Sequence, residues 1–478
     1  MSPAEAVVLT LYYAVLSALA VYSLHRFYLV RLRRRTPEPR RVTGDEYPPL
    51  TIQLPLFNEP NVAARLLDAV AAIEYPGPLD IQVLDDSTDD TPSIIAECVA
   101  SMQARGIRVA HIRRESRDGY KAGALAHGMS LSASELFAVF DADFVPPPDV
   151  LLRMVPHFAG ARIGMVQARW THLNRDRSLL TRVQALFLDA HFAVESAARN
   201  FTGRFFNFNG TAGVWRRAAI EEAGGWSAST LTEDLDLSYR AQLAGWSFVF
   251  LPDVEVPAEL PAALSGFQEQ QHRWAKGSIQ TARKVLPEIA RADVSRSVKA
   301  EAAFHLTNNS AYLLSVLLAL LIVPAMVIRH RHELIWSFVI DLVLYAASTA
   351  SVLLFYVEGQ RRAGRGRPPL RELLAVLPVG VGMSIRNASA VLEGLFQNGG
   401  HFRRTPKEGN GARVMRERAP RIPWGEMLLA LFFCGVIIAF GGTRQWLSVP
   451  FLTIFASGYG YVAAMALMER INYVKSAV

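Results

Sequence analysis

Long apolar runs lie at both ends of the chain, and a segment of mixed polarity separates them. Ala6–Leu24 contains no charged residue and is long enough to cross a bilayer core of about 30 Å at roughly 1.5 Å per residue. Four more runs of comparable length follow toward the C-terminus, namely Ala311–Ile328, Leu334–Phe355, Trp424–Phe440 and Leu447–Met468. The pattern predicts five membrane-spanning helices, with residues 31 to 305 held in one compartment.

The basic residues beside these runs predict the side of the membrane on which that compartment lies. Glu5 precedes the first run and arginines follow it, which reverses the charge order of a secretory signal and predicts an uncleaved anchor with its N-terminus outside. Arg329 and Arg331 fall on the outer side in this topology. The larger basic groups fall on the inner side: Arg26, Arg31 and Arg33 to Arg35, then Arg361, Arg362, Arg365 and Arg367, then Arg403 to Arg421. The positive-inside rule therefore places the middle segment in the cytosol.

One further apolar stretch, residues 371–396, is interrupted by Arg386, Asn387 and Glu393. A full crossing would put the basic residues that follow it outside the membrane. We therefore predict an amphipathic helix at the interface or a re-entrant segment.

Residues 48 to 255 alternate short β-rich runs with helical stretches, a pattern typical of a mainly parallel sheet covered by helices. The predicted strands are Leu50–Leu54, Asp80–Leu84, Val109–Ile112, Leu136–Phe140 and Met165–Ala168. Polar side chains follow three of them: Asn58 and Glu59, then Asp85 and Asp86, then Asp141 and Asp143. Ligands of open α/β sheets bind at the carboxyl ends of the strands, so these side chains are expected to meet in one crevice. No Gly-x-Gly-x-x-Gly or phosphate-binding P-loop pattern is present, which argues against dinucleotide or ATP chemistry.

Composition agrees with a chain divided between water and membrane, since 51% of its residues are hydrophobic and only 19% are charged. The net charge of +7 does not indicate a nucleic-acid partner, because the basic residues cluster beside apolar runs. The only cysteines, Cys98 and Cys434, lie far apart, which excludes a disulfide framework or a thiolate zinc site.

Asp141 and Asp143 are spaced so that two carboxylates reach one hard divalent cation, Mg²⁺ or Mn²⁺, through oxygen. Such a cation would offset charge on the diphosphate of a departing nucleotide. Paired acids at a strand end are more often a solvated turn or a helix cap. The hydrophobic strand before them and the other acids nearby favour the metal site.

Two residues are candidates for contact with the nucleotide. Asp85 could accept a hydrogen bond from a base or a ribose, whereas Ser87 to Asp90 resemble the N-cap of the next helix. Lys121 could meet phosphate or ribose oxygens, although a lone loop lysine is usually only solvated.

Thr232, Glu233 and Asp234 stand between a glycine-containing turn and a helical run. Thr232 suits the N-cap of that helix, and the two acids suit its first turn. A carboxylate at this place could also take the proton from an acceptor hydroxyl that attacks a sugar, and Asp234 is the candidate base.

Gln270, Arg273 and Trp274 lie in an amphipathic stretch that is expected to lie against the membrane. Gln270 and Arg273 are three residues apart on a helix, so they share a face and could hold a diphosphate, while Trp274 offers a plane for a sugar ring. The alternative is an Arg-Trp anchor at the bilayer surface.

This ordered set of acids followed by Gln-x-x-Arg-Trp resembles the membrane-integrated inverting glycosyltransferases of family 2, which include cellulose, hyaluronan and mannan synthases. The stretches LPLFNE, FNGTAGVWR, DVEVPAELP and QQHRWAKG are most similar to cellulose synthase-like mannan and glucan synthases and their bacterial relatives. The resemblance covers residues 48 to about 310.

The resemblance implies a role for each motif residue. Asp85 would contact the donor nucleotide, Asp141 and Asp143 would bind the nucleotide and its metal, and Asp234 would be the base. Lys121, Thr232 and Glu233 stay candidates from their own positions in the sequence. Gln270, Arg273 and Trp274 would form the platform for donor phosphate and acceptor. The residues after the ambiguous helix are similar to the gating loop of cellulose synthases at Phe402, Thr405 and Lys407, and depart from it at Arg404 and Pro406.

The resemblance also implies an α/β fold in which a cytosolic domain of the GT-A type, which binds nucleotide sugars, is inserted between membrane helices. The expected division is an anchor (1–30), the GT-A domain (48–255), interfacial helices with Gln-x-x-Arg-Trp (256–305) and a transmembrane bundle (306–478) that contains the loop 397–421. We expect no fused domain that binds a cyclic dinucleotide.

The resulting hypothesis is a processive enzyme that extends a β-glucan or β-mannan from UDP-glucose or GDP-mannose and passes it through a bacterial inner membrane. A lipid glycosyltransferase that adds one sugar to ceramide or diacylglycerol is the rival enzyme. A transporter or scaffold with a degenerate nucleotide fold is the non-enzymatic alternative, which the intact set of acids disfavours. The oligomeric state is left open.

Overall fold

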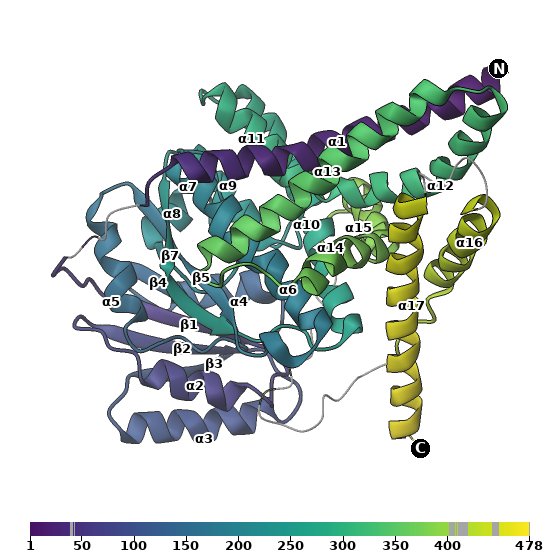
Figure 1. Cartoon of the computed structure of the whole chain (residues 1–478). Helices are drawn as coiled ribbons and strands as arrows, with labels where there is room; N and C mark the ends of the chain where they lie inside the picture. Colours follow the sequence, from purple (N-terminus) through teal and green to yellow (C-terminus); the bar gives the residue numbers. More distant parts are fainter. Residues whose placement is uncertain are drawn as a thin grey trace.

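The computed structural model describes residues 1–38, 42, 44–400, 407, 409, 419–441 and 449–477. Figure 1 shows an α/β domain on one side and a group of long helices on the other, with the N-terminal helix running from one part to the other. The α/β domain carries one seven-stranded sheet of order β3-β2-β1-β4-β6-β5-β7. Its strands are β1 (Leu50–Leu56), β2 (Leu79–Asp85), β3 (Val109–Arg113), β4 (Leu136–Val139), β5 (Ile163–His172), β6 (Gly213–Arg216) and β7 (Ser247–Ala258).

The sheet is mainly parallel, as the sequence predicts. β1 pairs in parallel with both β2 and β4, β2 pairs in parallel with β3, and β5 pairs in parallel with β7. Strand β6 runs antiparallel to its two neighbours, β4 and β5. The five predicted strands are confirmed within a few residues at their ends, whereas β6 and β7 were not predicted.

Helices cover both faces of the sheet, and each face has its own apolar core. Leu54, Leu67 and Val99 belong to the core shared with α2 and α3, whereas Leu125 and Trp215 belong to the core of the opposite face. The helices of the domain and its edge are α2 (Ala63–Ala71), α3 (Thr91–Ala104), α4 (Tyr120–Ser130), α5 (Val150–Met154), α6 (Leu179–Ala190), α7 (Ala197–Phe201), α8 (Arg217–Glu222), α9 (Glu233–Leu243), α10 (Leu264–Arg291) and α11 (Arg296–Thr307). Short helical segments are η1 (Val155–Ala159), η2 (Arg175–Arg177) and the π-helical η3 (His191–Ser196).

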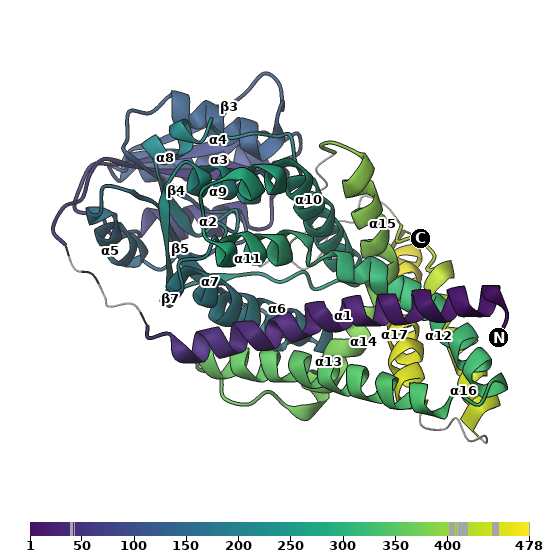
Figure 2. The same ribbon diagram turned by 90° about the horizontal axis from the view of Figure 1, so that it is seen from above.

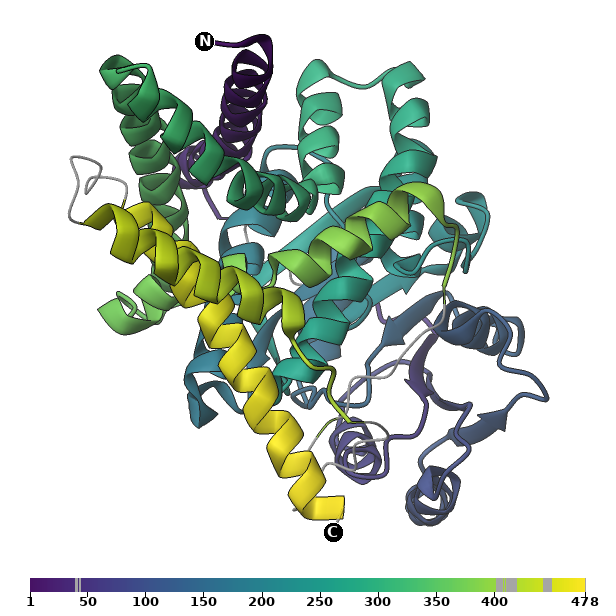
Figure 3. The same ribbon diagram turned by 90° about the vertical axis from the view of Figure 1, so that its right-hand side faces the viewer.

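Four helices in the described part of the chain are long and apolar enough to cross a membrane. They are α1 (Pro3–Arg35), α12 (Ser310–Arg331), α13 (Ile335–Arg362) and α17 (Val449–Ala477), and each matches a predicted span. The remaining predicted span corresponds to α16 (Trp424–Gly441), which is apolar but shorter. Figure 2 shows α1 and α13 side by side along their length, and Figure 3 shows α16 beside α17.

The ambiguous apolar stretch forms two helices, α14 (Leu370–Gly382) and α15 (Ser384–Phe396), with a bend of 49° between them. Such a pair is either a broken span or a re-entrant loop. The bend agrees with the prediction that this stretch is not a regular crossing.

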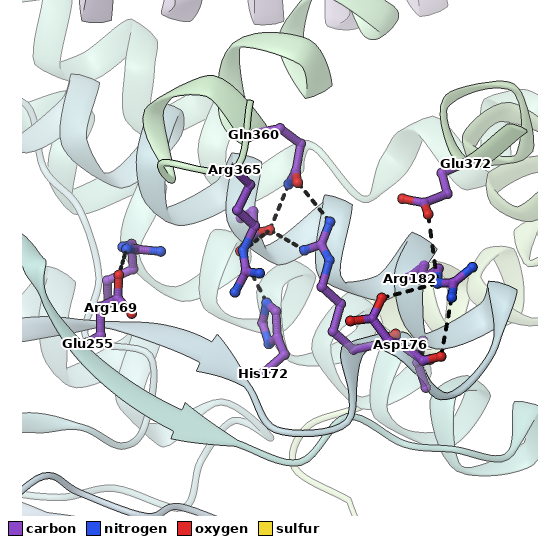
Figure 4. A network of polar contacts seen from close by, with 11 residues as sticks. Arg169, His172, Asp176, Arg182, Glu255, Gln360, Arg365 and Glu372 are labelled. Carbon is purple, nitrogen blue, oxygen red and sulfur yellow. Dashed lines mark hydrogen bonds and ion pairs between the residues drawn. The ribbon is translucent and has the colours of Figure 1, made fainter. Parts of the chain in front are cut away.

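A buried polar network joins the α/β domain to the membrane helices (Figure 4). The carboxylate of Asp189 on α6 is fully buried and accepts hydrogen bonds from Arg175 Nη1 and from Gln360 Nε2 on α13, both at 2.7 Å. His172 at the end of β5 lies 3.3 Å from the same carboxylate, and Arg365 lies 3.8 Å away. Burial opposes ionisation, but His172, Gln360 and Arg175 hold the pKa of Asp189 well below its usual range. The network fixes the end of α13 against the edge of the sheet.

Candidate active site

A cleft lies at the carboxyl ends of β1, β2 and β4 and is closed on its far side by α9 and α10. This is the edge at which ligands of open α/β sheets bind. The predicted site residues that line it are Lys121, Asp141, Asp143, Thr232, Glu233, Asp234, Gln270, Arg273, Trp274 and Lys407. The structure therefore brings together side chains that are nearly 300 residues apart along the chain.

Asp141 and Asp143 follow β4, and each contacts an ammonium group. Lys121 Nζ bonds to Asp141 Oδ1, and Lys407 Nζ lies 2.6 Å from Asp143 Oδ2. No group of three or more His, Cys, Asp or Glu side chains that could hold a metal occurs among the described residues. The two carboxylates offer the hard oxygen donors that a divalent cation takes.

Lys121 occupies the centre of this acidic group. Its Nζ also donates to the carbonyl of Gly210 at 2.8 Å. Burial alone would lower its pKa, but the carboxylates of Asp141, Glu233 and Asp234 outweigh burial and raise the pKa of Lys121. The ammonium therefore stays charged and is placed to meet an anionic ligand.

Asp234 lies in the first turn of α9, and its Oδ1 accepts a hydrogen bond from the backbone N–H of Leu235 at 2.8 Å. Gly210 approaches it closely: the glycine has φ +83°, and a Cβ there would stand 3.0 Å from Asp234 Oδ2. Burial, together with the nearby Glu233 carboxylate, raises the pKa of Asp234 to about 7. A carboxyl of that pKa is suited to accept a proton near neutral pH.

Helix α9 begins where the sequence predicts, with Thr232 at its N-cap position, but the predicted capping hydrogen bond is not formed. The Thr232 hydroxyl lies 3.3 Å from that of Thr281 on α10. Thr232 therefore joins α9 to the helix that carries Gln-x-x-Arg-Trp.

Helix α10 presents Gln270, Arg273 and Trp274 to the cleft. The Arg273 guanidinium is surrounded by Glu233, Asp141, Asp234 and Asp143, and burial lowers its pKa against their attraction. The N-terminus of α10 is fixed by Glu469 on α17, whose carboxylate accepts hydrogen bonds from the backbone N–H groups of Leu264 and Ser265. Helix α17 thus positions the helix that bears these side chains.

The contact between α9 and α10 depends on a residue without a side chain. A Cβ on Gly277 would stand 2.5 Å from Thr232 Cγ2, so one of the two residues would have to move to avoid a clash. We expect Gly277→Ala to push the two helices apart and to lower the turnover of the site by about tenfold to a hundredfold, because small misplacements of reacting groups are costly. Steady-state kinetics of the purified variant measures this effect.

Gly435→Ala is the matched control, because a Cβ added to this helical glycine on α16 would meet no neighbouring atom within 4 Å in the described part of the chain. Its turnover is expected to equal that of the wild type. Equal turnover in both variants would contradict the proposed tight fit of α10 on Thr232.

Asp85 does not line the cleft. Its buried carboxylate contacts His111 Nε2 at 2.8 Å and accepts from the backbone N–H of Ser87 at 2.9 Å. Asp86 lines the cleft instead and pairs with Arg114. Successive side chains at a strand end point to opposite sides, which explains why one acid of the pair faces inward and the other faces His111. The sequence could not tell which of the two acids points into the cleft.

A second cavity of about 430 Å³ adjoins the cleft, and its volume is in the range of ligand sites. It extends between the α/β domain and α1, α12, α13 and α14, with Tyr22, Arg26, Tyr312 and Tyr356 in its walls. Seven residues line both spaces and mark the junction: Trp170, Leu188, Asn209, Thr232, Asp234, Gln270 and Trp274. The candidate base and the tryptophan therefore stand where the cleft opens toward the membrane helices.

Several lining residues were not predicted as site residues. Two of them, Trp170 and His172, lie on β5, whose sequence carries no catalytic pattern. A third, Asn209, lies in the stretch FNGTAGVWR, which was noted for its resemblance but not as a source of site residues. In the gating-like loop, Phe402 and Thr405 lie outside the described residues. Lys407 is described, and its backbone oxygen accepts from Asn61 Nδ2 at 3.1 Å.

Residues 48–277 match the family model described as "Glycosyltransferase like family 2". A probable glucomannan 4-beta-mannosyltransferase 9 of Oryza sativa is 35% identical over 450 residues, which cover 88% of this chain and 82% of that protein. Glucomannan 4-beta-mannosyltransferase 1 of the same plant is 42% identical over 291 residues, and glucomannan 4-beta-mannosyltransferase 2 of Arabidopsis thaliana is 45% identical over 254 residues. In the last two matches the chain spans only 56% and 48% of the relative's length.

Among solved structures, a mannosyltransferase from Pyrobaculum calidifontis, determined with GDP-Man and Mn²⁺, aligns with a TM-score of 0.55 at 20% identity. The alignment covers 81% of this chain and 99% of that one. It confirms the predicted α/β fold of the GT-A type with apolar helices beside it.

Proposed function

The chain belongs to family 2 of the glycosyltransferases, and from this premise we propose that it transfers mannose from a nucleotide sugar to a growing β-linked polysaccharide. The observation that supports this most directly is the meeting of Asp141, Asp143, Asp234, Arg273 and Trp274 in one cleft that opens into a cavity among the membrane helices. A cleft for an activated sugar is thereby joined to a space that could take a glycan.

The residues around the end of β4 suit a nucleoside diphosphate with a divalent cation. Asp141 and Asp143 would hold Mg²⁺ or Mn²⁺, which would supply positive charge against the diphosphate. Lys121 and Arg273 add two cations to the same wall of the cleft. Both lysines now bound to the aspartates would exchange those contacts for phosphate oxygens when the donor binds.

The proposed reaction is a single displacement with inversion at the anomeric carbon. A hydroxyl oxygen of the acceptor forms the new bond to that carbon as its bond to the diphosphate oxygen breaks, and Asp234 accepts the hydroxyl proton. Arg273 and Lys121 stabilise the charge that develops on the leaving diphosphate. Trp274 offers its ring face to the acceptor sugar.

The sugar is proposed from the relatives, whose names specify mannosyl transfer. The test incubates the detergent-purified protein with GDP-mannose or UDP-glucose and with Mg²⁺ or Mn²⁺, and then weighs the products. A mannose polymer formed from GDP-mannose supports the proposal. A glycolipid with no longer product would support a lipid glycosyltransferase, and turnover of neither donor would contradict enzymatic function.

The second cavity supports the proposal that the growing glycan is held among the apolar helices. Its walls mix aromatic faces such as Phe267 and Tyr356 with hydrogen-bonding groups such as Tyr312 and Asn309, which is the lining that a sugar chain requires. We propose that the glycan leaves the cleft through this cavity, that the α/β domain lies in the cytosol, and that the membrane is a bacterial inner membrane.

The raised pKa of Asp234 predicts an acid limit to activity. The base works only when ionised, so kcat/KM is expected to fall as the pH drops through about 7 and to be retained above it. Glu233→Gln removes a carboxylate that raises the pKa of Asp234, so the acid limb of the profile, where kcat/KM falls, should move to lower pH. A pH profile of kcat/KM measures both effects.

Glu221→Gln is the control for this profile, because Glu221 is an exposed acid on α8. Its acid limb should coincide with that of the wild type. A wild-type limb below about pH 5, near the usual range for aspartate, would show that Asp234 does not set the limit.

A further inference from the structure

The helix that passes the junction of cleft and cavity contains the π-helical segment η3, between α6 and α7. Such segments are rare and occur frequently at functional sites. Here the segment places His191 and Glu195 together, with Nδ1 of the histidine 3.0 Å from Oε2 of the glutamate, and both side chains line the second cavity. Neither residue has a role in the proposed reaction as described above.

His191 also reaches across to the junction itself. Its Nε2 lies 2.9 Å from Oδ1 of Asn209. The carboxylate of Glu195 and the amide oxygen of Asn209 are both hydrogen-bond acceptors, so each ring nitrogen of His191 faces one acceptor. Asn207 supports the same amide orientation, because its Nδ2 donates to Asn209 Oδ1 at 3.3 Å and its backbone oxygen accepts from Asn209 Nδ2 at 3.4 Å.

The backbone of Asn209 is fixed as firmly as its side chain. Its N–H donates to Oε1 of the fully buried Gln167 at 3.0 Å. The next residue is Gly210, which packs against Asp234 and accepts from Lys121. Asn209 is therefore held beside the candidate base, and within the described part of the chain only one of its two amide N–H donors has a partner.

We propose that Asn209, oriented by His191 and Glu195, donates a hydrogen bond to the terminal sugar of the acceptor and so selects which hydroxyl reaches Asp234. The ligand is a hexose unit at the end of a glycan, whose hydroxyl groups accept such a bond. Asn209 contacts substrate in this scheme, whereas His191 and Glu195 are positioning residues. The inference rests on the proposed function, because it assigns a subsite of the same reaction.

The test compares Asn209→Ala, His191→Ala, His191→Gln and the double variant in the full-length protein, supplied with GDP-mannose, Mn²⁺ and a β-linked mannooligosaccharide. Asn209→Ala is expected to raise the acceptor KM or lower glycan transfer by about tenfold, the size of one lost hydrogen bond to substrate, while donor affinity changes less than twofold. His191→Ala should likewise weaken acceptor use while leaving donor affinity nearly unchanged. The variant that carries both His191→Ala and Asn209→Ala should lose no more transfer than Asn209→Ala alone, because the two residues act through one contact. His191→Gln, which keeps a side-chain donor, should recover part of the loss.

His127→Ala, an exposed histidine on α4, is the matched control and should leave both measurements unchanged. Equal losses of donor affinity and transfer in Asn209→Ala, or additive losses in the double variant, would overturn the inference. Wild-type transfer within twofold for Asn209→Ala would overturn it as well. A wild-type protein that turns over no nucleotide sugar would instead contradict the proposed function and this subsite together.

Discussion

Asp234→Asn is expected to lower kcat by about a hundredfold to ten-thousandfold, because the amide cannot accept the proton of the attacking hydroxyl. Asparagine keeps the shape of the side chain and the oxygen that accepts from the backbone N–H of Leu235. Donor affinity should therefore stay close to that of the wild type. Turnover and calorimetric binding of GDP-mannose, measured on the same preparation, separate the two properties.

The same substitution makes an independent prediction about stability. Burial and Glu233 disfavour the ionised form of Asp234, so removing its charge should leave the melting temperature unchanged or raised. Asp236→Asn, two residues further along α9, is the control, and it is expected to affect melting temperature and turnover in the opposite way. Asp236 is fully buried and pairs with Arg240 at 2.8 Å, so its loss should lower the melting temperature but leave turnover of the folded protein within a few-fold. Near-wild-type turnover in Asp234→Asn would refute the assignment of the base.

Asp143→Asn is expected to lower activity by at least about a hundredfold, which is the effect of several kcal/mol of lost transition-state stabilisation by a cation. A neutral amide is a poorer ligand for a hard divalent ion than a carboxylate. Lys407 would also lose the carboxylate that it contacts at 2.6 Å. Titration with Mn²⁺ should show that the metal-dependent part of nucleoside diphosphate binding is weakened in the variant.

Asp149→Asn is the control for this experiment, because Asp149 follows the same strand but is half exposed and outside the cleft. It should bind nucleoside diphosphate and Mn²⁺ as the wild type does. If Asp143→Asn kept a wild-type response to Mn²⁺, this carboxylate would not hold the cation.

The sheet was predictable where short hydrophobic runs end in polar residues, and less so elsewhere. Leu136–Val139 followed by two acids is a clear strand signal, and the structure confirms it. Strand β6 has only four residues and lies between a turn and a helix, so its periodicity is too short to detect. Strand β7 contains Pro252 and Pro257, which weaken a strand signal although both residues lie within it.

The candidate site was predictable as a set of residues but not as a set of contacts. The motifs identify Asp141, Asp234 and Trp274, and the structure places them in one cleft. Motif spacing does not report how side chains are oriented or how distant segments pack. It therefore could not show that the Asp85 carboxylate faces His111, or that His191 contacts Asn209. Donation from Lys407 to Asp143 likewise joins residues 264 positions apart.

The hydrogen bonds from the start of α10 to Glu469 have a consequence for biosynthesis. Because the glutamate belongs to α17, the helix that carries Trp274 receives these bonds only after the ribosome has made the chain as far as α17. We expect a nascent chain that does not yet contain α17 to lack a finished cleft. The proposed sugar transfer would then begin only after α17 lies beside the start of α10.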